Sequence, residues 1–244
     1  MSEENLINRW KNFKQPDITS LKCNICNFDG LVSNFKVYKA RDIFHAGELI
    51  RYQCPKCDVI FGDLRFLSMT DDEIGNDYKD VYSYYKEGDF SSSILSIINH
   101  INLGKDKKYL DYACGIPENT LKILNGEGYD VYGYDMYVEN KHPKFLKYID
   151  KNTKFDVVYS NNFIEHLIHP YEDLQKLIDL LDINGKLVLM SPDWEYHITF
   201  THYHTYFFTG RSTQCLCKKL NIKLIYDRQI YGSIVKIFEK IDKI

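Results

Sequence analysis

The sequence has few of the features that would place a protein in a membrane, in a secretion pathway or on nucleic acid. No stretch approaches 18 consecutive apolar residues, and the N-terminus (MSEENLINRW) is polar and acidic, which argues against a membrane span and a secretory signal. A basic excess is also missing, because 31 Lys and Arg stand against 34 Asp and Glu, whereas a general nucleic-acid binder usually carries surplus positive charge. Low-complexity tracts and internal repeats are absent. We therefore expect a soluble, cytoplasmic protein.

The composition is that of an ordinary globular protein. Hydrophobic residues make up 44% of the chain and charged residues 27%, which excludes wholesale disorder. A length of 244 residues is long for one simple domain and short for two full-sized ones. Nothing in this pattern favours one oligomeric state over another.

Cysteine is abundant, with seven copies, and four of them form two early pairs. Cys23-x2-Cys26 and Cys54-x2-Cys57 are separated by 27 residues. In a reducing compartment such pairs indicate a metal site rather than disulfides. Two facing pairs complete a tetrahedron of thiolates at about 2.3 Å from a Zn²⁺ ion, and four protein ligands make the site structural. The sequence therefore predicts a zinc ribbon, with zinc supplying stability that a short segment cannot draw from its own core.

The rest of the chain falls into two further parts. We expect the ribbon to occupy residues 1–66, a tyrosine-rich connecting helix residues 67–90, and a larger domain residues 91–244. Thr70 followed by Glu73 forms a capping-box pattern at the start of the connecting helix. From residue 91 onward short apolar segments alternate with helical patterns. We expect strands at 109–113, 130–134, 145–149, 155–160, 186–190, 223–227 and 234–239, and helices at 94–101, 118–124, 171–181 and 212–220.

This alternation predicts an α/β domain with a parallel sheet and helices on both faces, closed by an antiparallel edge where the last two strands meet. Ligands of such sheets bind outside the carboxyl ends of the strands. The segment 109–120 (YLDYACGIPENT) sits at such an end, with small residues at Ala113 and Gly115 that let the backbone approach a ligand. Asp135 ends the next strand and is placed to accept hydrogen bonds from ribose hydroxyls. The layout predicts a nucleoside cofactor.

Segment 109–120 resembles motif I of the class I S-adenosylmethionine (SAM) methyltransferases, usually written LDxGCGxG. Residues 155–167 (FDVVYSNNFIEHL) resemble the family's fourth strand and the start of its next helix, residues 184–192 (NGKLVLMSP) its fifth strand, and residues 204–209 (HTYFFT) the segment before its last helix. Four motifs in the right order span residues 91–244. The resemblance implies a Rossmann-like, seven-stranded, mostly parallel sheet with an antiparallel edge strand. It also implies SAM binding by Asp111, Ala113, Gly115, Asp135, Asn161 and Asn162.

Two residues depart from motif I. Ala113 replaces the first glycine and Pro117 the last. Alanine is a mild replacement, and proline suits the first turn of a helix, so the turn can survive both. If the two replacements closed the cofactor site instead, the domain would be a non-catalytic module that binds SAM or a partner.

Three histidines are candidate general bases for a hydroxyl acceptor. His204 leads because it matches the family segment, and His202 follows because the two would point to the same side of an extended chain. His166 opens the helix after the fourth strand beside Glu165, and adjacent helical residues diverge by about 100°, so we do not expect both at one point. Alternatively, His202 and His204 pack within an aromatic lid or form a metal-binding H-x-H pair. The resembling ubiquinone-pathway O-methyltransferases use an acid–histidine pair near this point with a divalent ion.

Four tyrosines and the three remaining cysteines can each be interpreted from the sequence. Tyr78, Tyr82, Tyr84 and Tyr85 either form a lid over the cofactor or fill the interface between two subdomains. Cys114 reads as a packing residue, and Cys215 and Cys217 as core and surface thiols.

The sequence as a whole predicts a SAM-dependent methyltransferase with a structural zinc. The ribbon followed by a Tyr-rich helix resembles enzymes of bacterial sugar and polysaccharide modification, which implies methylation, by inference O-methylation, of a small carbohydrate-like or nucleotide-linked acceptor in surface polysaccharide biosynthesis. One alternative is an RNA methyltransferase that uses the ribbon to hold its substrate, although the acidic balance disfavours a nucleic-acid partner. The other is the non-catalytic module.

Overall fold

The chain folds into two compact units, each described here by itself. The computed structural model describes residues 7, 9–10, 13–45, 47–83, 85–86, 88–115, 119–138, 141–197 and 201–241. Unit 1 comprises Met1–Glu87, Glu165–Ile168 and Trp194–Leu216, and unit 2 comprises Gly88–Ile164, His169–Asp193 and Cys217–Ile244. The expected boundaries at residues 66 and 90 do not coincide with these units, because unit 1 also takes up two segments from the second half of the chain. Among the described residues, no helix is long and apolar enough to cross a membrane.

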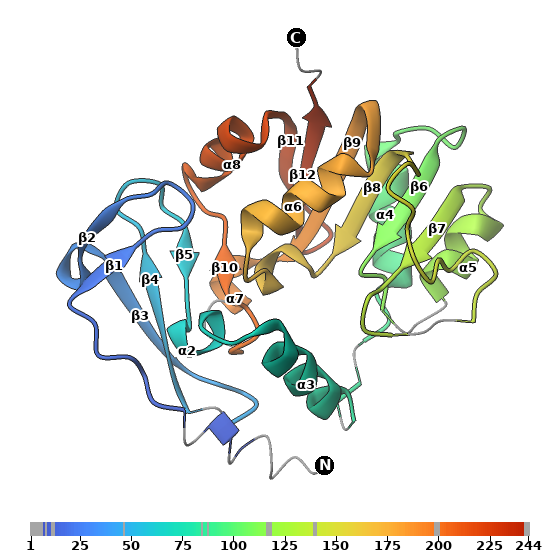
Figure 1. Cartoon of the computed structure of the whole chain (residues 1–244). Helices are drawn as coiled ribbons and strands as arrows, with labels where there is room; N and C mark the ends of the chain where they lie inside the picture. Colours follow the sequence, from blue (N-terminus) through green and yellow to red (C-terminus); the bar gives the residue numbers. More distant parts are fainter. Residues whose placement is uncertain are drawn as a thin grey trace. The chain divides into compact units, whose positions relative to one another are not determined.

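Unit 2 is built on a mixed, mostly parallel sheet, and this confirms the predicted α/β Rossmann-like fold (Figure 1). Its described strands follow the order β11-β12-β9-β8-β6-β7. Their bounds are β6 Lys108–Tyr112, β7 Asp130–Tyr134, β8 Phe155–Asn161, β9 Leu181–Pro192, β11 Ile222–Ile230 and β12 Ser233–Lys240. Instead of the expected strand at 145–149, the structure has a single parallel bridge from Phe145 to Gly133 beside β7. The seventh strand is therefore reduced to one bridge.

The antiparallel strand lies one position inside the sheet rather than at its edge. β12 pairs antiparallel with both β9 and β11, so β11 at the edge runs in the same direction as β9. The two strands are joined by Tyr231 and Gly232, both with positive φ, as a tight hairpin turn requires. The hairpin therefore inserts its second strand next to the parallel strands, because that strand carries the more buried residues (Val235, Ile237 and Phe238).

Helices bury both faces of the sheet in unit 2. α4 (Ser91–Ile101) and α5 (Asn119–Gly126) contribute Ile94, Ile97, Leu121 and Leu124 to a core that includes alternate residues of the strands. α6 (Pro170–Asp179) buries Leu174, Leu177 and Ile178, and Figure 1 shows it running across β8 and β9. A sheet buried on both faces has continuous apolar strands, as β8 and β9 do here.

Unit 1 contains a four-stranded antiparallel sheet of order β10-β5-β4-β3 and a separate β1-β2 hairpin. The bounds are β1 Ser20–Lys22, β2 Asp29–Leu31, β3 Lys36–Arg41, β4 Glu48–Gln53, β5 Ile60–Phe61 and β10 Tyr206–Phe207. The short helices are η1 Val32–Asn34, α2 Leu64–Leu67 and α7 Trp194–His197, and α8 (Ser212–Leu220) begins in this unit. We call the four-stranded sheet β10-β5-β4-β3 the ribbon sheet. Its strand β10 comes from the second half of the chain, far in sequence from the other three.

The predicted connecting helix is α3 (Asp71–Tyr82), and its predicted start is confirmed. The Thr70 side chain accepts a hydrogen bond from the Glu73 amide, and Glu73 accepts one from the Thr70 amide, which completes the capping box. α3 packs through Ile74 and Val81 on a core that includes Trp10 and Phe66. The helix thus belongs to unit 1 and is not a free connector.

Candidate functional site

The four predicted cysteines converge in unit 1. Cys23, Cys54 and Cys57 are buried, Cys26 is partly so, and their four sulfurs lie within 4.8 Å of one another. The Sγ atoms of Cys23 and Cys57 are 3.7 Å apart and those of Cys26 and Cys54 are 3.5 Å apart. Sulfurs at about 2.3 Å from a common zinc lie about 3.8 Å apart in a tetrahedron. The donor set and its spacing therefore fit a Zn²⁺ ion.

The two cysteine pairs lie on the same kind of turn. In each, the first cysteine donates its amide to a carbonyl five residues on and accepts from the amide four residues on: Cys23 with Phe28 and Asn27, and Cys54 with Val59 and Asp58. Asn27 and Asp58 adopt positive φ values of 57° and 67°. Asn and Asp are the non-glycine residues that tolerate this conformation best, so the residue after each second cysteine helps form the metal-binding turn.

A segment from the second half of the chain holds the second cysteine turn. The guanidinium of Arg211 donates to both carboxylate oxygens of Asp58 and to the Pro55 carbonyl. The Thr209 hydroxyl donates to the Asp58 carbonyl. Gly210, at φ +51°, passes so close that a Cβ atom there would lie 2.5 Å from the Asp58 carboxylate. Segment 209–211 therefore packs closely against the second cysteine turn and is hydrogen-bonded to it.

In unit 2, the loop after β6 has the backbone of a ligand-binding turn. Ala113 and Gly115 both have positive φ, 59° and 68°. Alanine in this conformation is strained by about 1 kcal/mol or more relative to glycine, so the loop keeps the glycine-like shape of motif I without the glycine. Pro117 lies outside the described residues.

The predicted acidic residues beside this loop have distinct environments. Asp135 accepts hydrogen bonds from the amides of Gly115, Tyr137 and Val138, and burial raises its pKa. Asp111 lies inside the sheet opposite Tyr159 of β8, and its burial raises its pKa to about 8. Asp135 therefore ties the turn to the next strand, whereas Asp111 lies beneath it.

The other predicted cofactor residues lie at the carboxyl end of β8. Asn161 is the last residue of the strand and is partly exposed. Asn162 follows with φ +51°, and its amide donates to the Met190 carbonyl of β9. The predicted residues Ala113, Gly115, Asp135, Asn161 and Asn162 thus all follow or end parallel strands of unit 2, the edge at which ligands of such sheets bind.

Glu165, His166 and His204 form a second cluster in unit 1. One ligand atom from each lies within 4.8 Å of the others, and the two imidazole rings are 4.8 Å apart between centroids. The Glu165 carboxyl is fully buried, neither oxygen has a hydrogen-bond partner among the described residues, and burial raises its pKa to about 8. Nδ1 of His166 lies 3.2 Å from the Tyr78 hydroxyl. Two imidazoles and a carboxyl at this spacing can exchange a proton, and they also match a metal donor set.

The expectation that Glu165 and His166 diverge is wrong. The two residues lie in the 3₁₀ turn η2 (Ile164–His166), α6 starts only at Pro170, and one ligand atom of each side chain lies within 4.8 Å of the other. Thr205 binds this turn to His204: its amide donates to the Glu165 carbonyl, and its hydroxyl donates to the Glu165 and Leu167 carbonyls. Two segments far apart in sequence are thereby joined next to the cluster.

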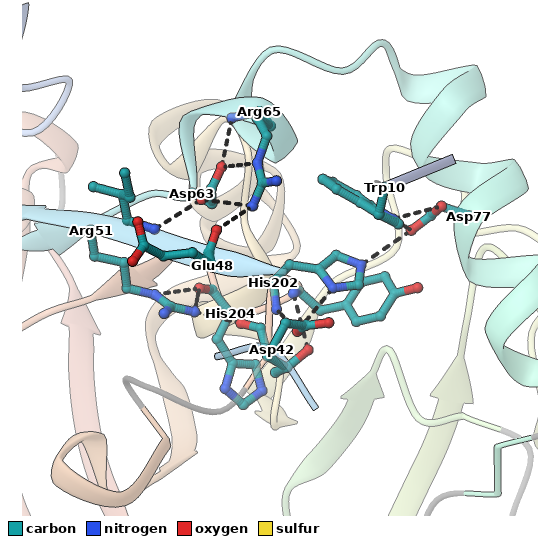
Figure 2. A network of polar contacts seen from close by, with 12 residues as sticks. Trp10, Asp42, Glu48, Arg51, Asp63, Arg65, Asp77, His202 and His204 are labelled. Atoms are coloured by element: carbon teal, nitrogen blue, oxygen red, sulfur yellow. Dashed lines mark hydrogen bonds and ion pairs between the residues drawn. The ribbon is translucent and has the colours of Figure 1, made fainter. Parts of the chain in front are cut away.

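His202 does not lie with His204 on one side, as an extended chain would require. Residues 201–205 form a turn, and the His202 imidazole is fully buried, with Nδ1 3.1 Å from Asp42 and Nε2 3.4 Å from Asp77 (Figure 2). Asp77 also accepts from the indole of Trp10 and the guanidinium of Arg9. Burial lowers the pKa of His202, but Asp42 and Asp77 outweigh it, and the pKa lies above the ordinary 6.5. Such a site favours a charged imidazolium with no access for an acceptor.

The tyrosines expected as a lid or as interface padding lie within unit 1. Tyr78 and Tyr82 of α3 pack against the Trp10 core, and Tyr78 also stacks on Tyr203. Tyr85 contacts the ring of Phe44, and Tyr84 lies outside the described residues. Asp42, Arg51 and Asp77, which surround the histidine turn, were not singled out by the sequence, since each is one charged residue in an unremarkable local pattern.

The chain is similar to methyltransferases. A family described as a methyltransferase domain matches residues 89–224, more than half of the chain. A SAM-dependent methyltransferase from Methanosarcina mazei is 17% identical and covers 60% of this chain and 98% of that chain, with a TM-score of 0.46. A SAM-dependent methyltransferase from Clostridium acetobutylicum is 14% identical (70% and 99%, TM-score 0.45), and an O-methyltransferase family protein from Burkholderia thailandensis is 12% identical (73% and 62%, TM-score 0.45). No curated protein matches the sequence.

We expect the four-cysteine cluster to bind one Zn²⁺ per chain. Cys54→Ser should lower the bound zinc and destabilise unit 1, because metal binding contributes directly to the folding of such small segments. Metal content by emission spectroscopy and the visible spectrum of the Co²⁺-substituted protein measure the first effect, and the thermal unfolding midpoint measures the second. Cys217→Ser is the control, since Cys217 is outside the cluster. Equal zinc content in wild type and Cys54→Ser would contradict this assignment.

We expect His202 to make the stability of the protein depend on pH. Because its pKa is raised in the folded state, its stabilising contribution is complete below pH 6.5 and is lost as the pH rises through the folded-state pKa. The urea unfolding midpoint of the wild type should therefore fall from about pH 6 to about pH 9 by more than that of His202→Gln. Groups that titrate in both proteins cancel in this comparison. Identical pH profiles would show that His202 is neutral in the folded state.

Proposed function

Because the chain belongs to the methyltransferase domain family, whose members transfer methyl groups from SAM, we propose that it methylates a small carbohydrate-like or nucleotide-linked acceptor. We propose O-methylation in surface polysaccharide biosynthesis, in the cytoplasm. The observation that carries the proposal is the match of residues 89–224 to the methyltransferase domain family, and the strained, glycine-like turn at Ala113 in unit 2 agrees with it.

On the donor side, the residues of unit 2 fit SAM. We assign Asp135 to the ribose hydroxyls, and its hydrogen bond to the Gly115 amide and the positive φ of Ala113 and Gly115 support a close approach of the cofactor to this turn. Asn161 and Asn162 offer amide groups at the end of β8. Bound SAM supplies an electrophilic methyl group on its sulfonium. Asp111 supports the turn from beneath rather than holding the ligand, in keeping with its burial.

On the acceptor side, we assign the acceptor's proton to His204, with His166 as its neighbour. A sugar hydroxyl loses its proton as the methyl transfers, and a positioned imidazole accelerates such a step about 10²- to 10⁴-fold. The buried Glu165 carboxyl lies beside both rings and can stabilise the imidazolium that forms. His202, in contrast, is held between two aspartates and is assigned a supporting role.

The acceptor class is supported by the size of the acceptor-side segments. Residues 193–205 are the whole connection from β9 to β10, too short for a separate substrate domain. The net charge of −3 disfavours a polyanion such as RNA. A small neutral polyol attached to a carrier is the acceptor that these features favour.

We expect SAM and its demethylated product S-adenosylhomocysteine to bind the zinc-loaded protein with micromolar affinity in calorimetric titrations. Asp135→Ala should abolish the heat, because it removes the proposed ribose contact and frees the turn at Gly115. Asp130→Ala is the matched control: Asp130 lies at the opposite end of the same strand, paired with Lys144. Absence of binding to the wild type would favour the non-catalytic module.

We expect His204→Gln to lower the rate of methyl transfer by about 10²- to 10⁴-fold with little change in SAM affinity. The substrates are radiolabelled SAM and a panel of nucleotide sugars, each tested with the wild type first. His166→Gln should have a smaller effect, and His169→Gln, at the start of α6 in unit 2, should have none. A fully active His204→Gln enzyme would remove His204 from the reaction.

A further inference from the structure

The turn that carries His204 is held through its backbone by a buried arginine. The guanidinium of Arg51 on β4 donates to the carbonyl of Thr201 at 2.5 Å and to that of His204 at 3.1 and 3.3 Å (Figure 2). The amide of His204 also donates to the Thr201 carbonyl at 3.3 Å, which closes the turn. One planar group thus bridges the first residue of the turn and the candidate base.

Burying the Arg51 guanidinium at this position costs free energy of folding. It is 1% exposed, and among the described residues no carboxylate lies within ion-pair distance of its guanidinium. Burial lowers its pKa to about 10, and the charges of Asp63 and Asp42 partly oppose this effect, so Arg51 stays charged at neutral pH. A buried cation without a directly paired carboxylate contributes less to stability than an apolar side chain of similar size. The arrangement of its three hydrogen bonds, rather than stability, is therefore what Arg51 contributes.

Arg65 is a second buried arginine in unit 1, and unlike Arg51 it forms a direct ion pair. It is also buried, but its Nε donates to Asp63 at 2.8 Å in a direct ion pair, and it binds the Glu48 and Phe13 carbonyls. Asp63, Glu48 and Phe13 all lie outside residues 201–205. The two buried arginines thus differ in the segment that they hold, which makes Arg65 a matched control for Arg51.

The turn is fixed from a second direction by Asp42, just after β3. One carboxylate oxygen of Asp42 accepts from the His202 amide at 2.8 Å and lies 3.1 Å from the His202 imidazole. Asp77 of α3 lies on the other side of that ring. β3 and β4 are paired neighbours in the ribbon sheet, so the same sheet presents both Asp42 and Arg51 to the turn.

We propose that Arg51 is a positioning residue for His204: its guanidinium fixes the backbone at Thr201 and His204 so that the imidazole is held beside Glu165 and His166. This role rests on the proposed function, in which His204 takes the acceptor's proton. The N-terminal ribbon sheet is then a working part of the acceptor site and not an appended module. Because the backbone of His204 is fixed by Arg51 and that of Thr205 by Glu165, only side-chain rotations remain free to move the ring.

The test is histidine side-chain NMR of the zinc-loaded full-length protein, together with hydrogen exchange of the peptide that covers 201–205. His204→Gln assigns the His204 resonance. In Arg51→Lys, which keeps the charge but loses the planar fork, we expect a shifted His204 titration midpoint and roughly tenfold faster exchange in the turn. Arg51→Met should show the same changes. Arg65→Lys should show neither.

A folded Arg51→Lys protein whose His204 midpoint and turn exchange match the wild type overturns the proposal, whatever the Met variant does. If both Arg51 variants fail to fold, the wild type decides. Its Arg51 Nε–H resonance should then exchange slowly and show contacts to residues 201–204, and a fast-exchanging resonance overturns the proposal.

These readouts are independent of the proposed function. SAM titration of Arg51→Lys should stay within about twofold of the wild type, because the proposed SAM residues lie in unit 2. Failure of SAM to bind the wild type would reject the methyltransferase assignment while leaving the NMR result intact. An unchanged NMR spectrum with normal SAM binding would reject only the role of Arg51.

Discussion

The antiparallel pairing of β10 with β5 is the interaction on which the structure of unit 1 depends. It places Tyr206 opposite Phe61 and Phe207 opposite Ile60, and so adds a strand from the second half of the chain to the ribbon sheet. The residues just before β10 are the histidine turn, and those just after it bind Asp58 of the second cysteine turn. A two-residue strand offers few hydrogen bonds of its own, so it needs the flanking contacts to Arg51, Glu165 and Asp58 to be stable. We therefore expect β10, the histidine turn and the cysteine cluster to stabilise one another.

Unit 1 buries an unusual number of charges for its size. Arg51, Arg65, Asp42, Asp63, Asp77 and His202 are all buried, and they form chains of contacts rather than isolated pairs (Figure 2). Taking such groups out of water costs several kcal/mol per ion, which good geometry recovers only in part. A structural zinc contributes about 10–16 kcal/mol of apparent binding free energy in small folds of this kind. The metal that we propose at the cysteine cluster thus offsets a polar interior that apolar burial alone would not support.

Sequence patterns predicted what local spacing determines and missed what only the tertiary fold brings together. The cysteine pairs, the capping box at Thr70 and the mostly parallel α/β sheet of unit 2 follow from short-range chemistry and alternation, and the structure confirms them. The prediction that His202 and His204 point to the same side was wrong, because it assumed an extended chain. Hydrogen bonds to Arg51 and Asp42 hold these residues in a turn instead. Those two partners are about 150 residues away in sequence; Arg51 lies in β4 and Asp42 just after β3. Glu165 lies in the cluster within the 3₁₀ turn η2, whose carbonyl at Glu165 accepts from the Thr205 hydroxyl, a long-range contact that local sequence does not indicate.

The candidate site in unit 2 consists largely of backbone groups and the cluster in unit 1 of side chains, and this difference bears on which residues select the acceptor. The proposed donor site in unit 2 is made largely of backbone: positive-φ residues, amides on Asp135 and the ends of strands. Backbone geometry of this kind suits any acceptor, since SAM is common to the whole family. The cluster of Glu165, His166 and His204 lies in unit 1, in segments that this unit takes from the second half of the chain. In the function that we propose, selection among acceptors acts through the residues around His204 that the β3–β4 sheet orders, because a group that only the transition state uses has to be fixed before the substrate arrives. On that proposal the sheet sets the position of the base.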